Sequence, residues 1–166
     1  VATSVAAPAS GRLLDMTASH EPSLFSIRPV TADDYERLVS LWTLSGMHLE
    51  IQGRESKSAF LQQLEQFPDL YLVATVGERI VGVVLGTHDG RKGWISRLAV
   101  HPECRRRGIA AALVTTCDTA IRVQGIGIVT ALVELGNAAS AALFESLGYR
   151  ADVPVLYFRK FDHLGA

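Results

Sequence analysis

Three consecutive arginines and a glycine, Arg105 to Gly108, stand between two segments of different periodicity. The segment before them, residues 95–100, is an apolar run typical of a strand, and Pro102 ends it. The segment that begins at Ile109 is rich in Ala and has the spacing of a helix. Because a helix N-terminus leaves backbone N–H groups unpaired and carries partial positive charge, this junction predicts a cradle for a phosphate or pyrophosphate. Gly108 would let the backbone approach such a ligand closely.

The positive charge of this loop is also compatible with a solvated basic surface or with a contact to nucleic acid. Elsewhere the sequence has no basic stripe and no aromatic residues interleaved with basic ones. We therefore favour a phosphate-bearing small ligand over nucleic acid, with at least one of the arginines free to face water.

Length and composition are those of one globular domain. The 166 residues, 48% of them apolar, can bury a core, and a net charge of −1 gives no general attraction to polyanions or membranes. Cys104 and Cys117 do not have the spacing of a zinc site, and no apolar run approaches the roughly 18 residues of a membrane span. We expect a cytoplasmic protein with a mobile tail over residues 1–23 and a single domain over residues 24–166. A transit peptide has a similar composition to this tail, but a lone Arg12 is a weak targeting signal.

The remaining periodicities predict a mixed α/β (α+β) domain, with a mostly antiparallel sheet of about six to seven strands and flanking helices. The expected strands are residues 25–30, 70–76, 79–87, 94–100, 128–135 and 153–161. The expected helices are residues 31–46, which open on a capping box of Thr31 and Asp34, and residues 56–67, 109–125 and 138–147. The passage from residue 94 to residue 135 should be a right-handed parallel crossover that ends in a buried strand.

A second pattern lies downstream, where Asn137 is followed by Leu143, Phe144, Leu147 and Gly148 on a predicted helix. Together with the R-R-R-G-I-A loop and the L-A-V-H-P run before it, this pattern resembles the two ordered motifs of the GNAT superfamily of acyl-CoA-dependent N-acetyltransferases. The resemblance extends over residues 25–161. It implies the GNAT fold, acetyl-CoA as cosubstrate and no metal.

The resemblance also implies where acetyl-CoA would bind. Backbone groups on the strand before the loop would hold the pantetheine arm as if it were an added strand, and the loop amides would hold the pyrophosphate. Asn137 would contact the arm through its side chain, although plain helix capping accounts for this residue equally well. The predicted cofactor-binding residues are Leu98, Ala99, Val100, Arg105, Arg106, Arg107, Gly108, Ile109, Ala110, Asn137 and Phe144.

The implied reaction is direct attack of a neutral amine on the thioester carbonyl, which requires a base, a donor to the oxyanion and optionally an acid for the leaving thiolate. Backbone N–H groups near Leu98 would serve the oxyanion. Related enzymes carry a Glu where this chain has Leu132, so Glu134, two residues on along the expected strand, is the candidate base, with a solvated carboxylate as the alternative. His48 and Glu50, in the loop after the first helix, are further candidates for binding or deprotonating a substrate.

The acid is a separate question because many relatives have Tyr where this chain has Phe144, which has no proton to donate. Tyr149 and Tyr157 are the candidate hydroxyls, and core packing is the alternative role for Tyr149. Since a CoA thiolate is a tolerable leaving group, the reaction can also proceed without an acid.

We therefore expect an acetyl-CoA-dependent N-acetyltransferase that acts on a primary amine of a small molecule, an amino acid or a protein N-terminus. The alternative is a regulatory module that binds CoA with little or no catalysis, as the substitutions at Leu132 and Phe144 suggest. No nucleic acid or membrane partner is expected. A homodimer is expected to form through the last strand or through the exposed edge of the antiparallel strands.

Overall fold

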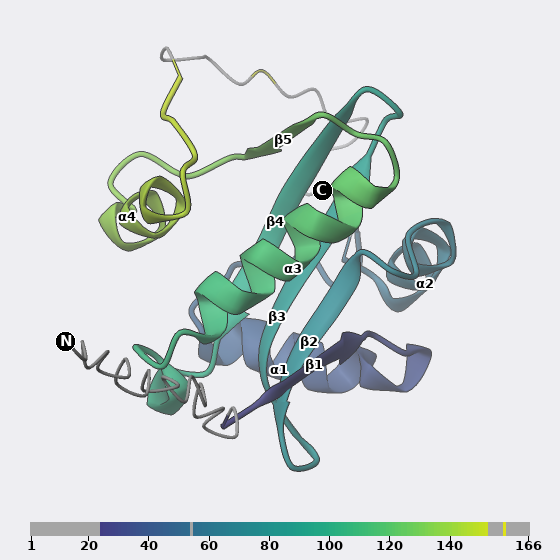
Figure 1. The fold of residues 1–166 in the computed structure, drawn as a ribbon. Coiled ribbons are helices and arrows are strands. Elements are labelled where there is room, and N and C mark those ends of the chain that lie inside the picture. Colours follow the sequence, from purple (N-terminus) through teal and green to yellow (C-terminus); the bar gives the residue numbers. More distant parts are fainter. Residues whose placement is uncertain (1–23, 54, 153–157, 159–166) are drawn as a thin grey trace, which may run out of the picture.

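A five-stranded sheet forms the centre of the computed structural model, which describes residues 24–53, 55–152 and 158. The strands are β1 (Ser26–Pro29), β2 (Tyr71–Val76), β3 (Arg79–His88), β4 (Lys92–Val100) and β5 (Ile128–Ala131). They lie side by side in chain order, antiparallel except for the parallel pair of β4 and β5 (Figure 1). The mixed, mostly antiparallel sheet is therefore confirmed, with fewer strands described than expected. Apart from Phe158, the predicted last strand lies outside the described residues.

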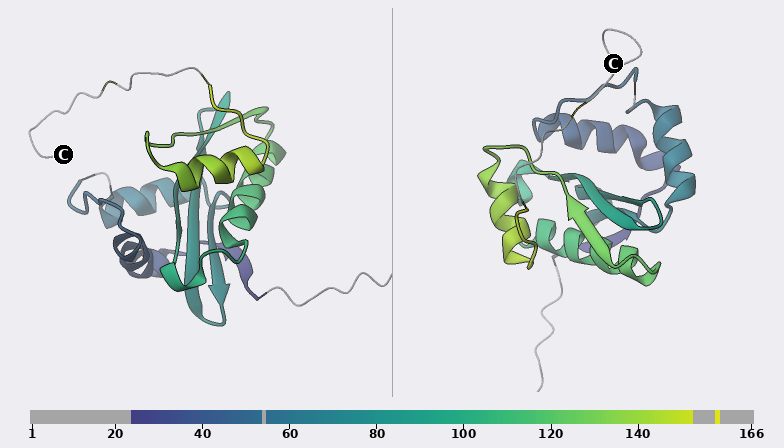
Figure 2. Two further views of the ribbon diagram at one scale, coloured as in Figure 1. Left: turned by 90° about the vertical axis from the view of Figure 1, so that its left-hand side faces the viewer. Right: turned by 90° about the horizontal axis from the view of Figure 1, so that it is seen from above.

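Helices cover both faces of the sheet. Helices α1 (Tyr35–Leu44) and α2 (Lys57–Gln66) lie on one side, and α3 (Ile109–Val123) and α4 (Ala138–Ser146) lie on the other (Figure 2). Two apolar clusters fill the two interfaces. The alternation along β2 shows the division, because Tyr71 and Val73 join the α1–α2 cluster whereas Leu72 and Ala74 join the α3 cluster. No helix among the described residues has the length and apolarity to cross a membrane.

The chain enters α1 through a short 3₁₀ turn (Ala32–Asp34) that forms the predicted capping box. The carboxylate of Asp34, fully buried, accepts hydrogen bonds from the Thr31 N–H at 2.9 Å and from Arg28 at 2.6 Å, and it pairs with Arg37 at 2.5 Å. Burial alone would raise the pKa of Asp34, but the hydrogen bonds from Arg28 and Thr31 outweigh it and lower the pKa to about 2. This carboxylate thus ties β1 to the start of α1.

Three glycines let α3 lie close against β3 and β4. A Cβ at Gly82 would come within 2.9 Å of Ile109, one at Gly86 within 2.6 Å of the Cys117 sulfur, and one at Gly93 within 2.5 Å of Ile121. Contacts that short are not found between real side chains, so larger residues there would push the helix away. The close packing fixes the N-terminus of α3 beside the end of β4.

The expectation of a buried strand over residues 128–135 is wrong in both length and burial. Strand β5 ends at Ala131, and Leu132 is 63% exposed. The reason is the course of the neighbouring strand: the last residue pair between β4 and β5 is Ile95 with Ala131, and beyond it the two strands part. Without a ladder partner among the described residues, the segment after Ala131 does not continue as a strand. Glu134 therefore does not share a strand face with Leu132, as had been expected.

Candidate active site

The edge of β4 that faces β5 is only partly paired. The two strands pair only over Lys92–Ile95 and Ile128–Ala131, whereas β4 continues to Val100. Figure 1 shows β5 diverging from β4 towards α4. Beyond Ile95, the β4 backbone on this side has no strand partner in the described part of the chain. Unpaired strand groups of this kind can hydrogen-bond to an extended ligand.

A bulge lies in β4 immediately beyond the last pair with β5. Val83 pairs with Ala99 and Leu85 with Ser96, so β4 carries one residue more than β3 across this step. The extra residue brings Arg97 into the left-handed region, with φ of +53°. The carbonyl of Arg97 accepts a hydrogen bond of 3.1 Å from the indole N–H of Trp42, on α1. The bulge is therefore held from the α1 side of the sheet.

The loop from β4 to α3 is shaped by its own contacts. The N–H of His101 donates to the Val81 carbonyl at 2.8 Å, and Cys104 packs into the core as part of a short 3₁₀ turn (Pro102–Cys104). The guanidinium of Arg105 folds back and donates to the Val100 carbonyl at 3.2 Å. Of the three arginines, Arg105 thus supports the loop itself, while all three remain exposed.

Two residues of this loop have left-handed backbone, Arg106 with φ of +62° and Gly108 with φ of +77°. Gly108 is the N-cap of α3 and has no side chain to accept from the first turn of the helix. The first amides of a 15-residue helix are consequently presented beside exposed arginines. This arrangement suits an anion such as a pyrophosphate.

Asn137 and Phe144 both have roles within the fold. The side-chain oxygen of Asn137 accepts a 3.1 Å hydrogen bond from the Ser140 N–H, so it caps α4 as predicted, and it is exposed. Phe144 is buried in the α3 cluster, with its ring centroid 5.1 Å from that of Tyr149. A contact of either side chain with CoA stays a prediction.

The structure places the candidate acids and bases in different surroundings. The hydroxyl of Tyr149 donates to the carboxylate of Asp118, on α3, at 2.9 Å. Burial and this hydrogen bond raise the pKa of the Tyr149 hydroxyl. Glu134 is exposed in the turn between β5 and α4, where its carbonyl accepts from the Asn137 N–H. Tyr157 lies outside the described residues.

The described residues of the segment between α1 and α2, residues 47–53 and 55–56, lie against the β4 bulge. The carboxylate of Glu55 forms an ion pair with the guanidinium of Arg97, which also approaches the His48 carbonyl at 3.5 Å. The N–H of Glu50 donates to the Glu55 carboxylate at 2.9 Å. The candidate residues named from the sequence in this loop are His48 and Glu50, and the contacts among Arg97, Glu55 and Trp42 were not predicted. No local spacing reveals their contacts, because the partners are far apart in the chain.

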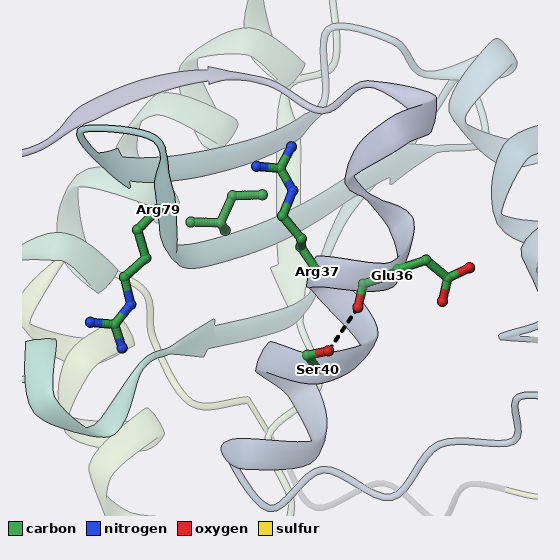
Figure 3. A pocket seen from close by; sticks show the side chains of 5 residues that line it. Glu36, Arg37, Ser40 and Arg79 are labelled. Atoms are coloured by element: carbon green, nitrogen blue, oxygen red, sulfur yellow. Dashed lines mark hydrogen bonds between the residues drawn. The ribbon is translucent and has the colours of Figure 1, made fainter.

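A surface hollow lies apart from this region, between α1 and the hairpin of β2 and β3. It is lined by Glu36, Arg37, Ser40, Arg79 and Ile80 (Figure 3). Arg79, which lines this hollow, donates a hydrogen bond of 2.7 Å to the ring of His101, at the start of the loop between β4 and α3. This bond links the hollow to the loop. No group of three or more metal-ligating side chains occurs in the described ranges.

Comparison with known proteins gives one consistent family. The sequence profile of the Acetyltransferase (GNAT) family matches residues 35–149, from the start of α1 to just beyond α4. An acetyltransferase from Sodalis glossinidius is 32% identical over 134 residues, 81% of this chain and 93% of that protein. One from Photorhabdus laumondii is 34% identical over 123 residues, 74% of this chain and 85% of that protein. This chain belongs to the GNAT family of N-acetyltransferases.

Solved structures share the fold. The PaiA N-acetyltransferase from Thermoplasma acidophilum, solved in complex with coenzyme A, matches with a TM-score of 0.68 and 20% identity over 79% of this chain and 92% of that one. YncA from Salmonella typhimurium, solved with its cofactor acetyl-CoA, matches with a TM-score of 0.63 and 22% identity over 82% and 88%. At these identities the likeness describes the arrangement of helices and strands.

Proposed function

We propose that this protein transfers the acetyl group of acetyl-CoA to a primary amine of a small molecule, an amino acid or a protein N-terminus by direct attack. The observation that carries the proposal is that two features follow each other along the chain. The edge of β4 beyond Ile95 is open, and the loop after β4 leads to the exposed first amides of α3. An extended arm that ends in a pyrophosphate fits this pair of features, because the arm needs backbone partners and the phosphates need amides and positive charge.

The proposed binding mode uses mainly the backbone. The pantetheine arm lies along Leu98, Ala99 and Val100 and bonds to those of their backbone groups that point away from β3. The amides from Arg106 to Ala110, including that of Ile109, face the pyrophosphate, with the exposed Arg106 and Arg107 adding positive charge. Arg105 acts through its hydrogen bond to Val100, and Asn137 and Phe144 border the arm from α4.

In the proposed reaction, the lone pair of the amine nitrogen attacks the thioester carbonyl carbon, and the carbonyl oxygen becomes an oxyanion near the backbone amides of the β4 bulge. Collapse of the tetrahedral intermediate expels the CoA thiolate. The attacking nitrogen loses its proton to a base, for which we propose Glu134, an exposed residue three positions beyond the end of β5.

We propose no proton transfer by Tyr149 while its hydroxyl donates to Asp118, because a phenol with a raised pKa that is bound to a carboxylate keeps its proton there. Tyr157 stays the candidate acid. Phe144 has no ionisable proton to donate, and its presence is the motive for the alternative in which the chain binds CoA without efficient catalysis. A cytoplasmic location and a homodimer stay predictions.

A thiol-release assay with acetyl-CoA and a panel of amines separates the two functions. The panel should contain free amino acids, polyamines, aminoglycosides and peptides with free N-termini. We expect release of CoA that depends on the amine, together with an acetylated product detected by mass spectrometry. Binding of acetyl-CoA without turnover on any amine would favour the regulatory module.

A further inference from the structure

Arg97 occupies a backbone conformation that its surroundings must maintain. It is one of only two non-glycine residues with positive φ in the described part of the chain, the other being Arg106 in the loop. A side chain disfavours the left-handed region, so such a residue persists only where neighbouring contacts fix it. Arg97 stands at the β4 bulge, two residues beyond the last pair of β4 with β5.

Contacts from the α1 side fix both the backbone and the side chain of Arg97. Its carbonyl accepts from the indole of Trp42, which is 2% exposed and packs edge-on against Phe60 of α2. Its guanidinium is paired with Glu55, and the two side chains are only 22% and 11% exposed. Removing either charge would break an ion pair that is largely shielded from water, which makes the pair sensitive to substitution.

Glu55 also holds described parts of the segment between α1 and α2. Its carboxylate accepts from the Glu50 N–H at 2.9 Å, and its carbonyl accepts from the Tyr35 hydroxyl at 2.8 Å. One carboxylate therefore holds a turn of this segment and the bulge of β4 at the same time. The segment and the bulge cannot move independently while the ion pair is intact.

We propose that Arg97 and Glu55 are positioning residues for acetyl transfer: their ion pair fixes residues 48–50 and 55 against the β4 bulge and so sets the place of the acceptor amine relative to the thioester. This inference rests on the proposed function. The mutual neutralisation of the two charges makes them a positioning pair instead of a binding site for a charged substrate. The pyrophosphate end of acetyl-CoA is held by other contacts, since the loop is anchored through Val81 and Val100, and we therefore expect little change in acetyl-CoA affinity.

Four variants test the pair: Arg97→Ala, Arg97→Lys, Glu55→Gln and the double variant Arg97→Ala with Glu55→Gln. Reacting groups displaced by about 1 Å lose roughly a hundredfold in rate. We expect kcat with the best amine of the panel to fall by at least about tenfold in Arg97→Ala and Glu55→Gln, and the Kd for acetyl-CoA to stay within about twofold. The double variant should be no slower than the slower single variant, because both remove the same interaction.

Two further variants serve as controls. Arg97→Lys keeps the charge and should recover a large part of the lost kcat. Glu36→Gln breaks an exposed ion pair with Lys57 that also joins α1 to α2, and it should leave kcat unchanged. Thermal melts of every variant, with assays well below the melting temperature, separate lost positioning from lost folding.

Hydrogen exchange gives a readout that does not need the acceptor. Breaking the pair should speed exchange in residues 47–56 and around the bulge, and leave the loop of residues 101–108 unchanged. A kcat within about twofold of the wild type in folded Arg97→Ala and Glu55→Gln, additive losses in the double variant, or unchanged exchange in both segments would each overturn the proposal. A wild-type protein that binds acetyl-CoA but acetylates no amine would instead overturn the proposed function.

Discussion

Gly108 is the residue on which the shape of the proposed anion cradle depends most. Its φ of +77° lies where a β-branched side chain is strongly disfavoured, although a Cβ there would meet nothing within 4 Å. Replacement by valine should therefore act through the backbone, by turning the first amides of α3 away from the ligand. We expect Gly108→Val to weaken acetyl-CoA binding by at least about tenfold, or 1.4 kcal/mol, in isothermal titration.

Gly125 provides the matched control for this prediction. It follows α3 at its other end with φ of +86°, and a Cβ there would also meet nothing within 4 Å. Gly125→Val should lower the free energy of unfolding without changing the Kd for acetyl-CoA. Equal affinity in Gly108→Val and the wild type would mean that the phosphates bind elsewhere.

Glu134 is the residue on which the proposed proton transfer depends. Replacing a general base by its amide typically costs about a hundredfold in rate or more. Glu134→Gln should therefore lower kcat by about that factor and leave acetyl-CoA binding nearly unchanged, as measured by steady-state kinetics and titration. Glu145, exposed on α4, is the control, and its change to Gln should be silent. Full activity in Glu134→Gln would shift the search for the base to Glu50.

At the scale of elements, the glycines of β3 and β4 determine how closely α3 approaches the sheet. An alanine at Gly86 would place its Cβ 2.6 Å from the Cys117 sulfur and 3.1 Å from the Leu70 carbonyl oxygen. We expect Gly86→Ala to lower the free energy of unfolding by about 1 to 3 kcal/mol in urea titration, as overpacking does. Gly127→Ala, where nothing lies within 4 Å, should be close to neutral, and equal stability of the two variants would contradict this packing.

The elements also show what local sequence patterns can and cannot predict. The helical spacing of Ile109, Leu113 and Ile121 correctly predicts the buried face of α3, because that face is set by the period of the helix itself. Strand β5 ends at Ala131 because β4 and β5 part beyond this residue, and the apolar run in the sequence does not show where they part. The contact of Arg97 with Glu55 is even harder to predict from sequence, since it joins a bulge to a loop 42 residues earlier.

For the candidate site, the strand–loop–helix setting of the arginines and Gly108 is confirmed because such a junction has a local sequence pattern, while their contact with an anion stays a prediction. The positioning residues had no such pattern. Their side chains are brought together only when α1, the segment after it and β4 have packed, so a structure was needed to find them.

At the scale of the whole molecule, Asp34 links the N-terminal strand to α1 and makes stability depend on pH. The ordinary pKa of 3.8 falls to about 2 in the folded state, so the unfolded chain binds more protons between these values. The contribution, roughly 2 kcal/mol, is complete above about pH 4 and is lost as the pH falls through about 2.

Asp34→Asn should remove this contribution and lower the free energy of unfolding at pH 7 by about 2 to 4 kcal/mol, because Arg28 and Arg37 lose their shared partner. It should also flatten the dependence of stability on pH between 4 and 2, which denaturant titrations at several pH values would measure. Asp33→Asn, at the exposed neighbouring position, is the control. An unchanged pH dependence in Asp34→Asn would contradict the assigned role of this carboxylate.

The central claim, that acetyl-CoA lies along the open edge of β4 with its pyrophosphate at the start of α3, is tested most directly by titrating the ¹⁵N-labelled protein with acetyl-CoA and following its backbone amides by NMR. The largest shifts should fall on Leu98 to Val100 and on Arg106 to Ala110, with smaller shifts near Asn137. Largest shifts in the hollow between α1 and the β2–β3 hairpin, or no saturable shifts at all, would contradict the claim.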